Sequence, residues 1–348
     1  MSSESYGALL RLDERPLATR HGEFRLHRFR NLATHRSALA AVIGDVETRE
    51  PLLARVHSSC VTSETYGACD CDCAEQLAIA VAEIGRVGRG IVFYLMQEGR
   101  GAGFAAKARD RMLVQASGHR LTTFEAYEQM GLGKDHRHYD EVEAACRLLG
   151  IRAPLRLLSN NPDKIAALAA EGIAIDSVQR LEHEPTPFNV HYIAAKQRSG
   201  HLLGAGESTP RAAELPEPVD AFEPYALPEL PHVVHMASYL LPVRFFGDAD
   251  PCWFRLHAYL DAESESEHVV LDHRRRRDQV PLTSVQRGTL EDRFPLREPS
   301  APRRRWQNAV ARIANRGAGC VLFENGEGVL ATPDPTGMDL LAHHAASP

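Results

Sequence analysis

The stretch AEQLAIAVAEIGRVGRGIVFYLMQ, residues 74–97, gives the clearest indication of the fold. Its first part carries apolar residues at helical spacing and ends at Gly88, so it predicts a helix over 74–88 with a normal stop. The apolar run that follows predicts a buried strand over 90–97. A helix that leads directly into a buried strand is typical of domains that mix helices with a sheet.

The same pattern continues on both sides of this stretch. Upstream, three segments have the apolar patterns of strands: 23–30, 37–46 and 51–59. Downstream, a loop is expected over 98–104, helices over 104–116 and 139–151, a strand over 155–161, and a helix over 161–173 with proline in its first turn. Because strands and helices alternate, we expect an α/β (mixed α+β) fold.

Composition and charge exclude several classes of function. The chain has 348 residues, a length that favours two domains. Its net charge of −6 gives no indication of binding to nucleic acid or to membranes. The basic runs at 274–277 and 303–305 are short, and solvated surface or dimer contacts explain them better than nucleic acid does. The N-terminus has no apolar signal core and no run is long enough to span a membrane, so we expect a cytoplasmic protein.

A change in composition divides the chain after residue 203. The segment 204–219, GAGESTPRAAELPEPV, is rich in proline, glutamate and alanine and has little apolar content, as is typical of a linker. We therefore expect a catalytic domain over 1–203, a linker over 204–225, a second region over 226–331 and a flexible tail over 332–348.

The second region repeats features of the first. FRLH occurs at 24–27 and again at 254–257, an offset of 230. GRGIVF at 88–93 matches GAGCVLF at 317–323, and QEGRG at 97–101 matches GEGV at 326–329, both at an offset of 229. Anchors that keep their register in this way favour a degenerate copy of the first half of the catalytic domain, with a structural or regulatory role. An unrelated small domain is the alternative.

The cysteines point to a metal. Seven are present, an odd number, and four of them lie between residues 60 and 73, which is typical of a metal site rather than of a disulfide framework. Cys60, Cys71 and Cys73 with an open position for water would form a reactive zinc site. With Cys69 as a fourth ligand they would form a closed, structural site, so the residues alone leave both open. In the second region, the positions that correspond to Cys60, Cys71 and Cys73 at the offset of 229 carry no cysteine; they are Thr289, Ser300 and Pro302.

Seven motifs in unbroken order resemble those of the GTP cyclohydrolase II family, whose enzymes catalyse the first step of riboflavin biosynthesis. They are RVHSSC at 55–60, CDC at 71–73, EQL at 75–77, GRGI at 88–91, QEGRG at 97–101, DHR at 135–137 and SNNPDK at 159–164. The resemblance covers roughly residues 22–203. It does not explain the C-terminal third of the chain.

This resemblance implies a zinc enzyme that acts on GTP. In the family three cysteines hold Zn²⁺ and water fills the fourth position; carried over, the ligands are Cys60, Cys71 and Cys73. Family members open the imidazole ring of GTP at C8 and release formate and pyrophosphate. The resemblance also implies Mg²⁺ on the triphosphate and a homodimer.

The resemblance also assigns substrate contacts and catalytic groups. The phosphate contacts correspond to Arg55, Val56, His57, Ser58 and Ser59, and to Glu98, Gly99 and Arg100. Positions that contact the rest of the nucleotide correspond to Gln76, Thr123, Ser159 and Lys164. For pyrophosphate release, Asp135 corresponds to the proton acceptor and Arg137 to the nucleophile. Arginine suits phosphate because its planar fork binds two oxygens at once.

Some positions depart from the family. Arg111 stands where the family usually has tyrosine, close to the reacting ring, and Asp70 stands where it usually has arginine. Ser59 replaces a usual glutamate and Tyr127 a common asparagine. We expect Arg111 to take part in catalysis and to change the fate of the ring-opened intermediate.

Three alternatives to the ordinary enzyme therefore stay open. A divergent cyclohydrolase would act on another purine or pyrimidine nucleotide or stop at a formylated intermediate. A nucleotide-binding regulator would bind without turnover. A zinc-stabilised interaction module would hold its metal with four cysteines, Cys69 included.

Overall fold

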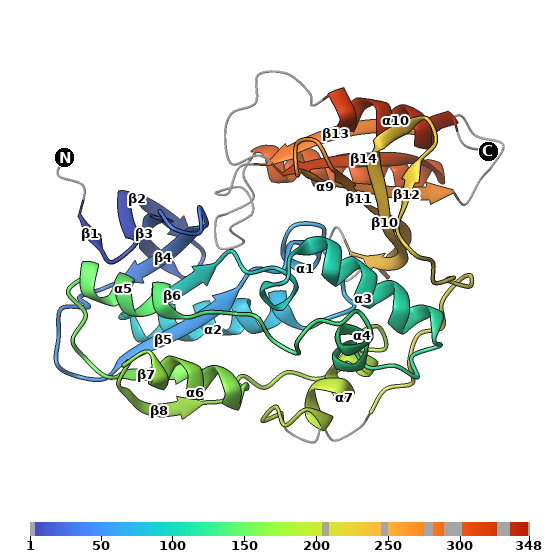
Figure 1. Ribbon diagram of the computed structural model, residues 1–348. Helices are drawn as coiled ribbons and strands as arrows, with labels where there is room; N and C mark the ends of the chain where they lie inside the picture. Colours follow the sequence, from blue (N-terminus) through green and yellow to red (C-terminus); the bar gives the residue numbers. More distant parts are fainter. Residues whose placement is uncertain are drawn as a thin grey trace.

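The computed structural model describes residues 4–203, 209–244, 250–274, 281–288, 301–325 and 335–346, which form two sheets with helices packed on them (Figure 1). The first sheet has eight strands in the order β1-β2-β3-β4-β6-β5-β7-β8. Their bounds are β1 Ser5–Tyr6, β2 Leu9–Thr19, β3 Gly22–Asn31, β4 Ser37–Ile43, β5 Leu52–Ser58, β6 Gly90–Leu95, β7 Leu155–Leu158 and β8 Ile175–Gln179. The pairs β6–β5, β5–β7 and β7–β8 are parallel and the other pairs are antiparallel, so the mixed α/β prediction is confirmed.

The helices of this part are mostly those that the sequence predicts. They are α1 Val61–Glu64, α2 Cys73–Val87, α3 Phe104–Ala116, α4 Thr123–Gln129, α5 Asp140–Leu148, α6 Pro162–Ala170 and α7 Val190–Arg198, with a short 3₁₀ turn η1 Gly99–Gly101. Helix α2 ends at Gly88, whose φ of 73° is the left-handed conformation that favours glycine, and whose N–H bonds back to Ile84 and Gly85. Its Leu77 and Ile84 pack on the strands of the first sheet.

The second sheet repeats the strand order of the first. Its order is β13-β14-β12-β11-β10-β9, which read backwards corresponds to β1-β2-β3-β4-β6-β5. The bounds are β9 Tyr225–Leu227, β10 Leu230–Val243, β11 Cys252–Asp261, β12 Glu267–Arg274, β13 Leu282–Gly288 and β14 Ala318–Asn325, with helix α9 Ala301–Arg316 before β14. Among the strands described for the second sheet, the β13–β14 pair alone is parallel, as the corresponding β5–β6 pair is in the first sheet.

One glycine in each sheet marks the correspondence at atomic detail. A Cβ on Gly90 would lie 2.5 Å from the carbonyl oxygen of Leu53, and one on Gly319 would lie 2.4 Å from that of Leu282. Both pairs of residues are related by the offset of 229 found in the sequence. The second sheet with α9 is therefore a smaller, degenerate copy of the first half of the larger domain. The copy's GEGV motif and the counterparts of Cys60 and Cys71 lie outside the described residues.

Helix α3 joins the two parts (Figure 1). Its Phe104 and Met112 belong to one apolar core with Trp306 and Phe323 of the second part. Gln115 of α3 also bonds the backbone of Leu240 in β10, as donor and as acceptor, at 2.8 Å each. The two parts thus share a buried interface rather than a loose contact.

The C-terminal segment is not the flexible tail that the sequence analysis expects. Residues Pro335–Ala346 form helix α10. Its Leu340 and Leu341 are buried against Val270 of β12 and Leu322 of β14, because this face of the second sheet is apolar and needs a cover.

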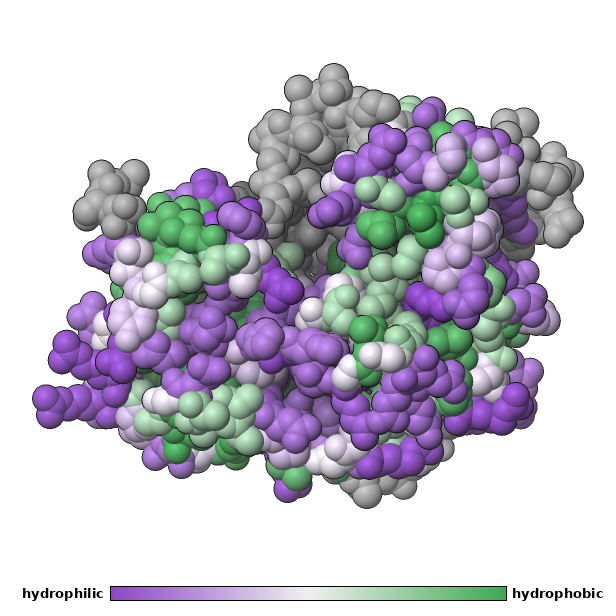
Figure 2. Space-filling view, in the orientation of Figure 1, coloured by the Kyte–Doolittle hydropathy of each residue, from purple (hydrophilic) through white to green (hydrophobic). Residues whose placement is uncertain are grey.

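The connection between the parts is irregular but packed. Residues 209–224 contain no helix or strand, as a linker predicts. Val219 is nevertheless buried, and Leu215 and Phe222 pack against the apolar core of the second part. Figure 2 shows apolar residues gathered over the second part and over the N-terminal strands, with hydrophilic residues between them. In the described ranges, no helix is both long and apolar enough to span a bilayer.

Candidate metal and nucleotide site

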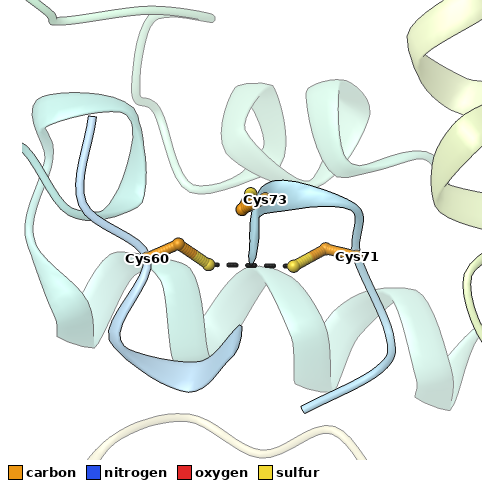
Figure 3. A group of neighbouring side chains, drawn as sticks. All are labelled: Cys60, Cys71 and Cys73. Atoms are coloured by element: carbon orange, nitrogen blue, oxygen red, sulfur yellow. Dashed lines mark hydrogen bonds between the residues drawn. The ribbon is translucent and has the colours of Figure 1, made fainter. Parts of the chain in front are cut away.

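Three thiols meet at the start of α1 and α2. One ligand atom each of Cys60, Cys71 and Cys73 lies within 4.8 Å of the others, and the Sγ atoms of Cys60 and Cys71 are 3.7 Å apart (Figure 3). Cys60 precedes α1, and Cys73 is the first residue of α2. Hydrogen bonds from Cys71 and Cys73 lower the pKa of the Cys60 thiol. Three converging thiols are a donor set that suits Zn²⁺ with one position left for a further ligand.

Cys69 does not join this group. Its Sγ lies 3.6 Å from the carbonyl oxygen of Gly67, and its N–H bonds the carbonyl of Pro242 in β10. Burial raises the pKa of its thiol to about 11, which disfavours the thiolate that a metal needs. The geometry thus separates Cys69 from the other three.

Lys107 of α3 provides a positive charge beside the thiols. Its Nζ lies 3.1 Å from Sγ of Cys60, 3.0 Å from Oγ1 of Thr62 and 2.7 Å from Oε1 of Glu98. Burial favours loss of its proton, but the Cys60 thiolate and Glu98 outweigh this and raise the pKa of Lys107. The ammonium therefore offsets the negative charge of a thiolate cluster. Lys107 is not among the residues predicted from the sequence.

A pocket lined by basic side chains opens beside Cys73, and we call it the basic pocket. Its lining residues are Arg55, His57, Ser58, Cys73, Gln76, Arg100, Arg137, Ser159, Asn160, Asn161, Lys164, Tyr192, Lys196 and His201. Five of these are arginine or lysine, and none of these lining residues is a carboxylate. Such a pocket fits a polyanion such as a nucleotide triphosphate.

The predicted contacts from β5 and α2 meet in this pocket. Arg55 donates to Oε1 of Gln76 at 2.9 Å and to the carbonyl of Leu158 at 2.9 Å, while its buried Nε has no hydrogen-bond partner. Lys164 donates to the carbonyl of Val56 at 2.8 Å. Burial and the neighbouring Arg55 lower the pKa of Lys164. Both side chains are thus held in place but keep donor capacity for a ligand.

His57 has a defined tautomer. Arg55 lies 3.3 Å from its Nδ1, and because arginine only donates, Nδ1 accepts and the proton is on Nε2. Nε2 then donates to Glu64, 2.5 Å away, which also accepts from the hydroxyl of Tyr94. Burial and Arg55 lower the pKa of His57 well below its ordinary value, so it is neutral. Its ring thus helps to hold Arg55, and both residues line the basic pocket.

The Gly-rich loop is shaped by backbone contacts. A Cβ on Gly101 would lie 2.5 Å from the carbonyl oxygen of His136, so only glycine fits there. Arg100 has a φ of 56° and its guanidinium lies over the ring of Phe124 at 4.0 Å. Tyr127, the departure from the family noted above, donates to the carbonyl of Gly99 at 2.9 Å. Glu98 accepts from the backbone of Val61 at 2.7 Å, which ties this loop to α1.

Asp135 and Arg137 form an ion pair at the edge of the basic pocket. Nε of Arg137 lies 2.8 Å and 3.1 Å from the two carboxylate oxygens of Asp135. Burial raises the pKa of Asp135, but hydrogen bonds from Arg137 overcome this and lower it. Arg137 lines the pocket, whereas Asp135 is not among its lining residues. The pair therefore presents one fixed cation to the pocket.

Arg111 and Thr123 lie in a second pocket, on the other side of Tyr192. We call this the Arg111 pocket; Asp70, His119, His191 and Trp253 are among its other lining residues. Nε of Arg111 lies 3.5 Å from Oδ2 of Asp70, and its guanidinium lies 4.6 Å from the ring centre of Tyr192. The hydroxyl of Thr123 donates to Asp110 at 2.8 Å. The two predicted residues are therefore apart from the phosphate contacts, and Tyr192 lines both pockets.

Several lining residues come from segments that the sequence analysis did not assign. Tyr192 and Lys196 lie on α7, and Lys196 pairs with the buried Asp72, which also contacts Nε2 of His183 at 3.1 Å. Burial raises the pKa of Asp72, but Lys196 and His183 lower it well below its ordinary value. The spacing of Tyr192 and Lys196, four residues apart on one helix face, is the signal that could have found them. Four of the predicted contacts line neither pocket: Val56, Ser59, Glu98 and Gly99.

The fold and the site define a mixed α/β protein with a three-thiol group beside a basic pocket. The family model for GTP cyclohydrolase II matches residues 11–181. A GTP cyclohydrolase-2 from Teredinibacter turnerae is 40% identical over 190 residues, which cover 54% of this chain and 92% of the relative. One from Yersinia pseudotuberculosis is 39% identical over 196 residues, which cover 56% of this chain and 98% of the relative.

The chain belongs to the GTP cyclohydrolase II family. The resemblance noted in the sequence, and the hydrolase class that it implies, are thereby confirmed at the level of the family. A riboflavin biosynthesis protein RibBA from Chlorobium phaeovibrioides is also 40% identical over 191 residues, 55% of this chain, but there the match spans only 46% of the relative. The second sheet lies beyond the residues that the family model matches.

Proposed function

We propose that this protein is a zinc-dependent GTP cyclohydrolase II, which opens the imidazole ring of GTP at C8 and releases formate and pyrophosphate. The observation that supports it most is the placement of Cys73, which belongs to the three-thiol group and also lines the basic pocket. A nucleotide whose phosphates occupy that pocket would bring its base to the thiols.

Zinc held by Cys60, Cys71 and Cys73 would supply Lewis acidity and make water reactive near neutral pH. Lys107 stabilises the thiolate of Cys60. The arginines and lysines of the basic pocket would bind the triphosphate together with Mg²⁺ and hold the guanine beside the thiols.

Asp135 and Arg137 are proposed to act in pyrophosphate release, as the resemblance implies. Hydrogen bonds that Arg137 donates to Asp135 raise the pKa of Arg137 although burial opposes this, so the guanidinium stays protonated. This supports a role for Arg137 as a cation on the phosphates more than as a nucleophile. A homodimer and a cytoplasmic location remain proposals from the sequence.

The test is mass spectrometry of the products after the zinc-loaded protein is incubated with GTP and Mg²⁺. A formate-free diaminopyrimidine and pyrophosphate are expected. Cys71→Ser is the control that should leave GTP unchanged. If wild-type protein binds GTP but leaves it intact, the chain is a nucleotide-binding regulator. If it does not bind GTP, a panel of other purine and pyrimidine nucleotides would identify a different substrate.

A divergent end point is the second candidate, and the Asp70–Arg111 pair favours it. Both residues of this ion pair line the Arg111 pocket, and Asp70 directly precedes Cys71 in the sequence. The permanent charge of Arg111 would therefore lie close to the proposed reaction site. A product that retains the formyl group would establish that the reaction stops before the second hydrolysis.

A further inference from the structure

A second group of metal-ligating side chains lies far from the thiols, in the C-terminal part. His257 of β11, Asp272 of β12 and His344 of α10 each offer one ligand atom, and these atoms lie within 4.8 Å of one another. They lie on the face of the second sheet that α10 covers, whereas α9 packs on the opposite face. The group therefore connects the sheet to the C-terminal helix.

Each histidine has one ring nitrogen fixed by a hydroxyl group. Nδ1 of His257 lies 2.7 Å from Oγ of Ser238, and Nε2 of His344 lies 2.7 Å from the hydroxyl of Tyr259. The other ring nitrogen of His257, Nε2, is buried and has no hydrogen-bond partner. Metal-binding histidines show this arrangement, because an outer hydrogen bond on one nitrogen orients the other towards the ion.

The types of side chain also suit a cation. Arg274 lies 3.2 Å from Asp272 and orients its carboxylate. Two imidazoles and one carboxylate form a donor set for a divalent transition metal.

We propose that His257, Asp272 and His344 bind a divalent transition-metal ion of the zinc class, which holds α10 on the second sheet. This site contains no sulfur ligand, in contrast to the thiol group. Its role is structural: the metal would link a helix of twelve residues to the sheet, in addition to the contacts of Leu340 and Leu341.

Cobalt titration of the metal-free full-length protein tests this. Thiolate ligands produce a near-ultraviolet charge-transfer band, whereas histidine and carboxylate ligands produce only weaker visible bands. We expect the thiolate band to reach its maximum at one equivalent of Co²⁺ and the visible bands to rise further until about two equivalents. The His344→Ala variant should lose the second equivalent, and the matched control His343→Ala should keep it.

A graded variant separates this site from a simple hydrogen-bonded histidine cluster. Tyr259→Phe removes only the outer hydrogen bond on His344, so it should weaken the second Co²⁺ equivalent roughly 10- to 100-fold. The proposal is overturned if Co²⁺ binding stops at one equivalent, or if His344→Ala leaves the second equivalent unchanged. Failure of the thiol site would instead appear as loss of the near-ultraviolet band.

Discussion

Asp70 and Arg111 form one buried ion pair, with Oδ2 of Asp70 3.5 Å from Nε of Arg111. Both residues were noted in the sequence as departures from the pattern that the resemblance implies, and their contact makes them a single structural feature. Oδ1 of Asp70 and Nε of Arg111 are both buried without a hydrogen bond. Since both residues line the Arg111 pocket, these atoms are available to a bound ligand.

The first prediction concerns this pair. Asp70→Asn removes the carboxylate that contributes most to raising the pKa of Arg111, whereas Asp110 and the contact with Tyr192 remain, so it should destabilise the protein by about 3 kcal/mol or somewhat less. A double-mutant cycle with Arg111→Met, measured by urea denaturation, should give a coupling energy of roughly 0.5–3 kcal/mol. Additive effects would show that the two residues do not interact.

The second prediction separates the four clustered cysteines. Cys71→Ser should lose bound zinc and activity, because it removes one of three converging ligands. Cys69→Ser should keep one zinc per chain and most of the activity, because its thiol lies apart from the group. Metal analysis of purified protein checks both. Loss of zinc in Cys69→Ser would support the closed, four-cysteine site instead.

The third prediction concerns the basic pocket. Arg100→Met removes a lining cation that has no carboxylate partner in the described residues, so it should weaken GTP binding about 10- to 100-fold. Lys134→Met is the matched control, because Lys134 is exposed and lies outside the pocket. Calorimetry at two salt concentrations would measure this. Equal affinities for the two variants would place the phosphates elsewhere.

The fourth prediction is a pH dependence of stability. Burial lowers the pKa of His27 from 6.5 to about 4. The unfolded chain therefore binds the proton more tightly, so stability is complete above about pH 6.5 and falls as the pH drops towards 4. Between pH 7 and pH 5, the titration of His27 alone should lower the free energy of unfolding by about 2 kcal/mol.

His27→Gln should reduce that loss in urea denaturation at the two pH values. The control is His35→Asn at an exposed turn position, where asparagine tolerates the positive φ of 55°. An equal loss in His27→Gln and in wild type would mean that His27 does not titrate in this range.

The fifth prediction compares the two sheets. Gly90→Ala and Gly319→Ala should each destabilise the protein by more than about 1 kcal/mol, because the new Cβ would lie within 2.5 Å of a carbonyl oxygen. Gly133→Ala is the control, since its nearest neighbours are side-chain atoms of His136 at 3.4 Å. Thermal unfolding measures all three. A neutral Gly319→Ala would argue against equivalent packing in the second sheet.

Elements whose signals are local could be predicted from the sequence. Helix α3 has the predicted bounds, and α2 stops at the predicted Gly88, because periodicity and left-handed glycine are properties of neighbouring residues. Membership of the family could also be predicted from the sequence, because the family's motifs are short and occur in a fixed order. The internal repeat could be predicted as well, because its constant offset relates Gly90 to Gly319. The prediction of a flexible C-terminal tail was wrong for residues 335–346, because α10 is stabilised by its contacts with a sheet whose strands are distant in the sequence.

The folded structure alone shows which distant side chains meet. It separates Cys69 from three neighbours in the sequence, because its backbone bonds Pro242 of the second part. It also brings Lys107 to Cys60 and Lys196 to Asp72. These contacts depend on how helices pack on the sheet, and packing depends on the complementarity of whole surfaces rather than on any local pattern.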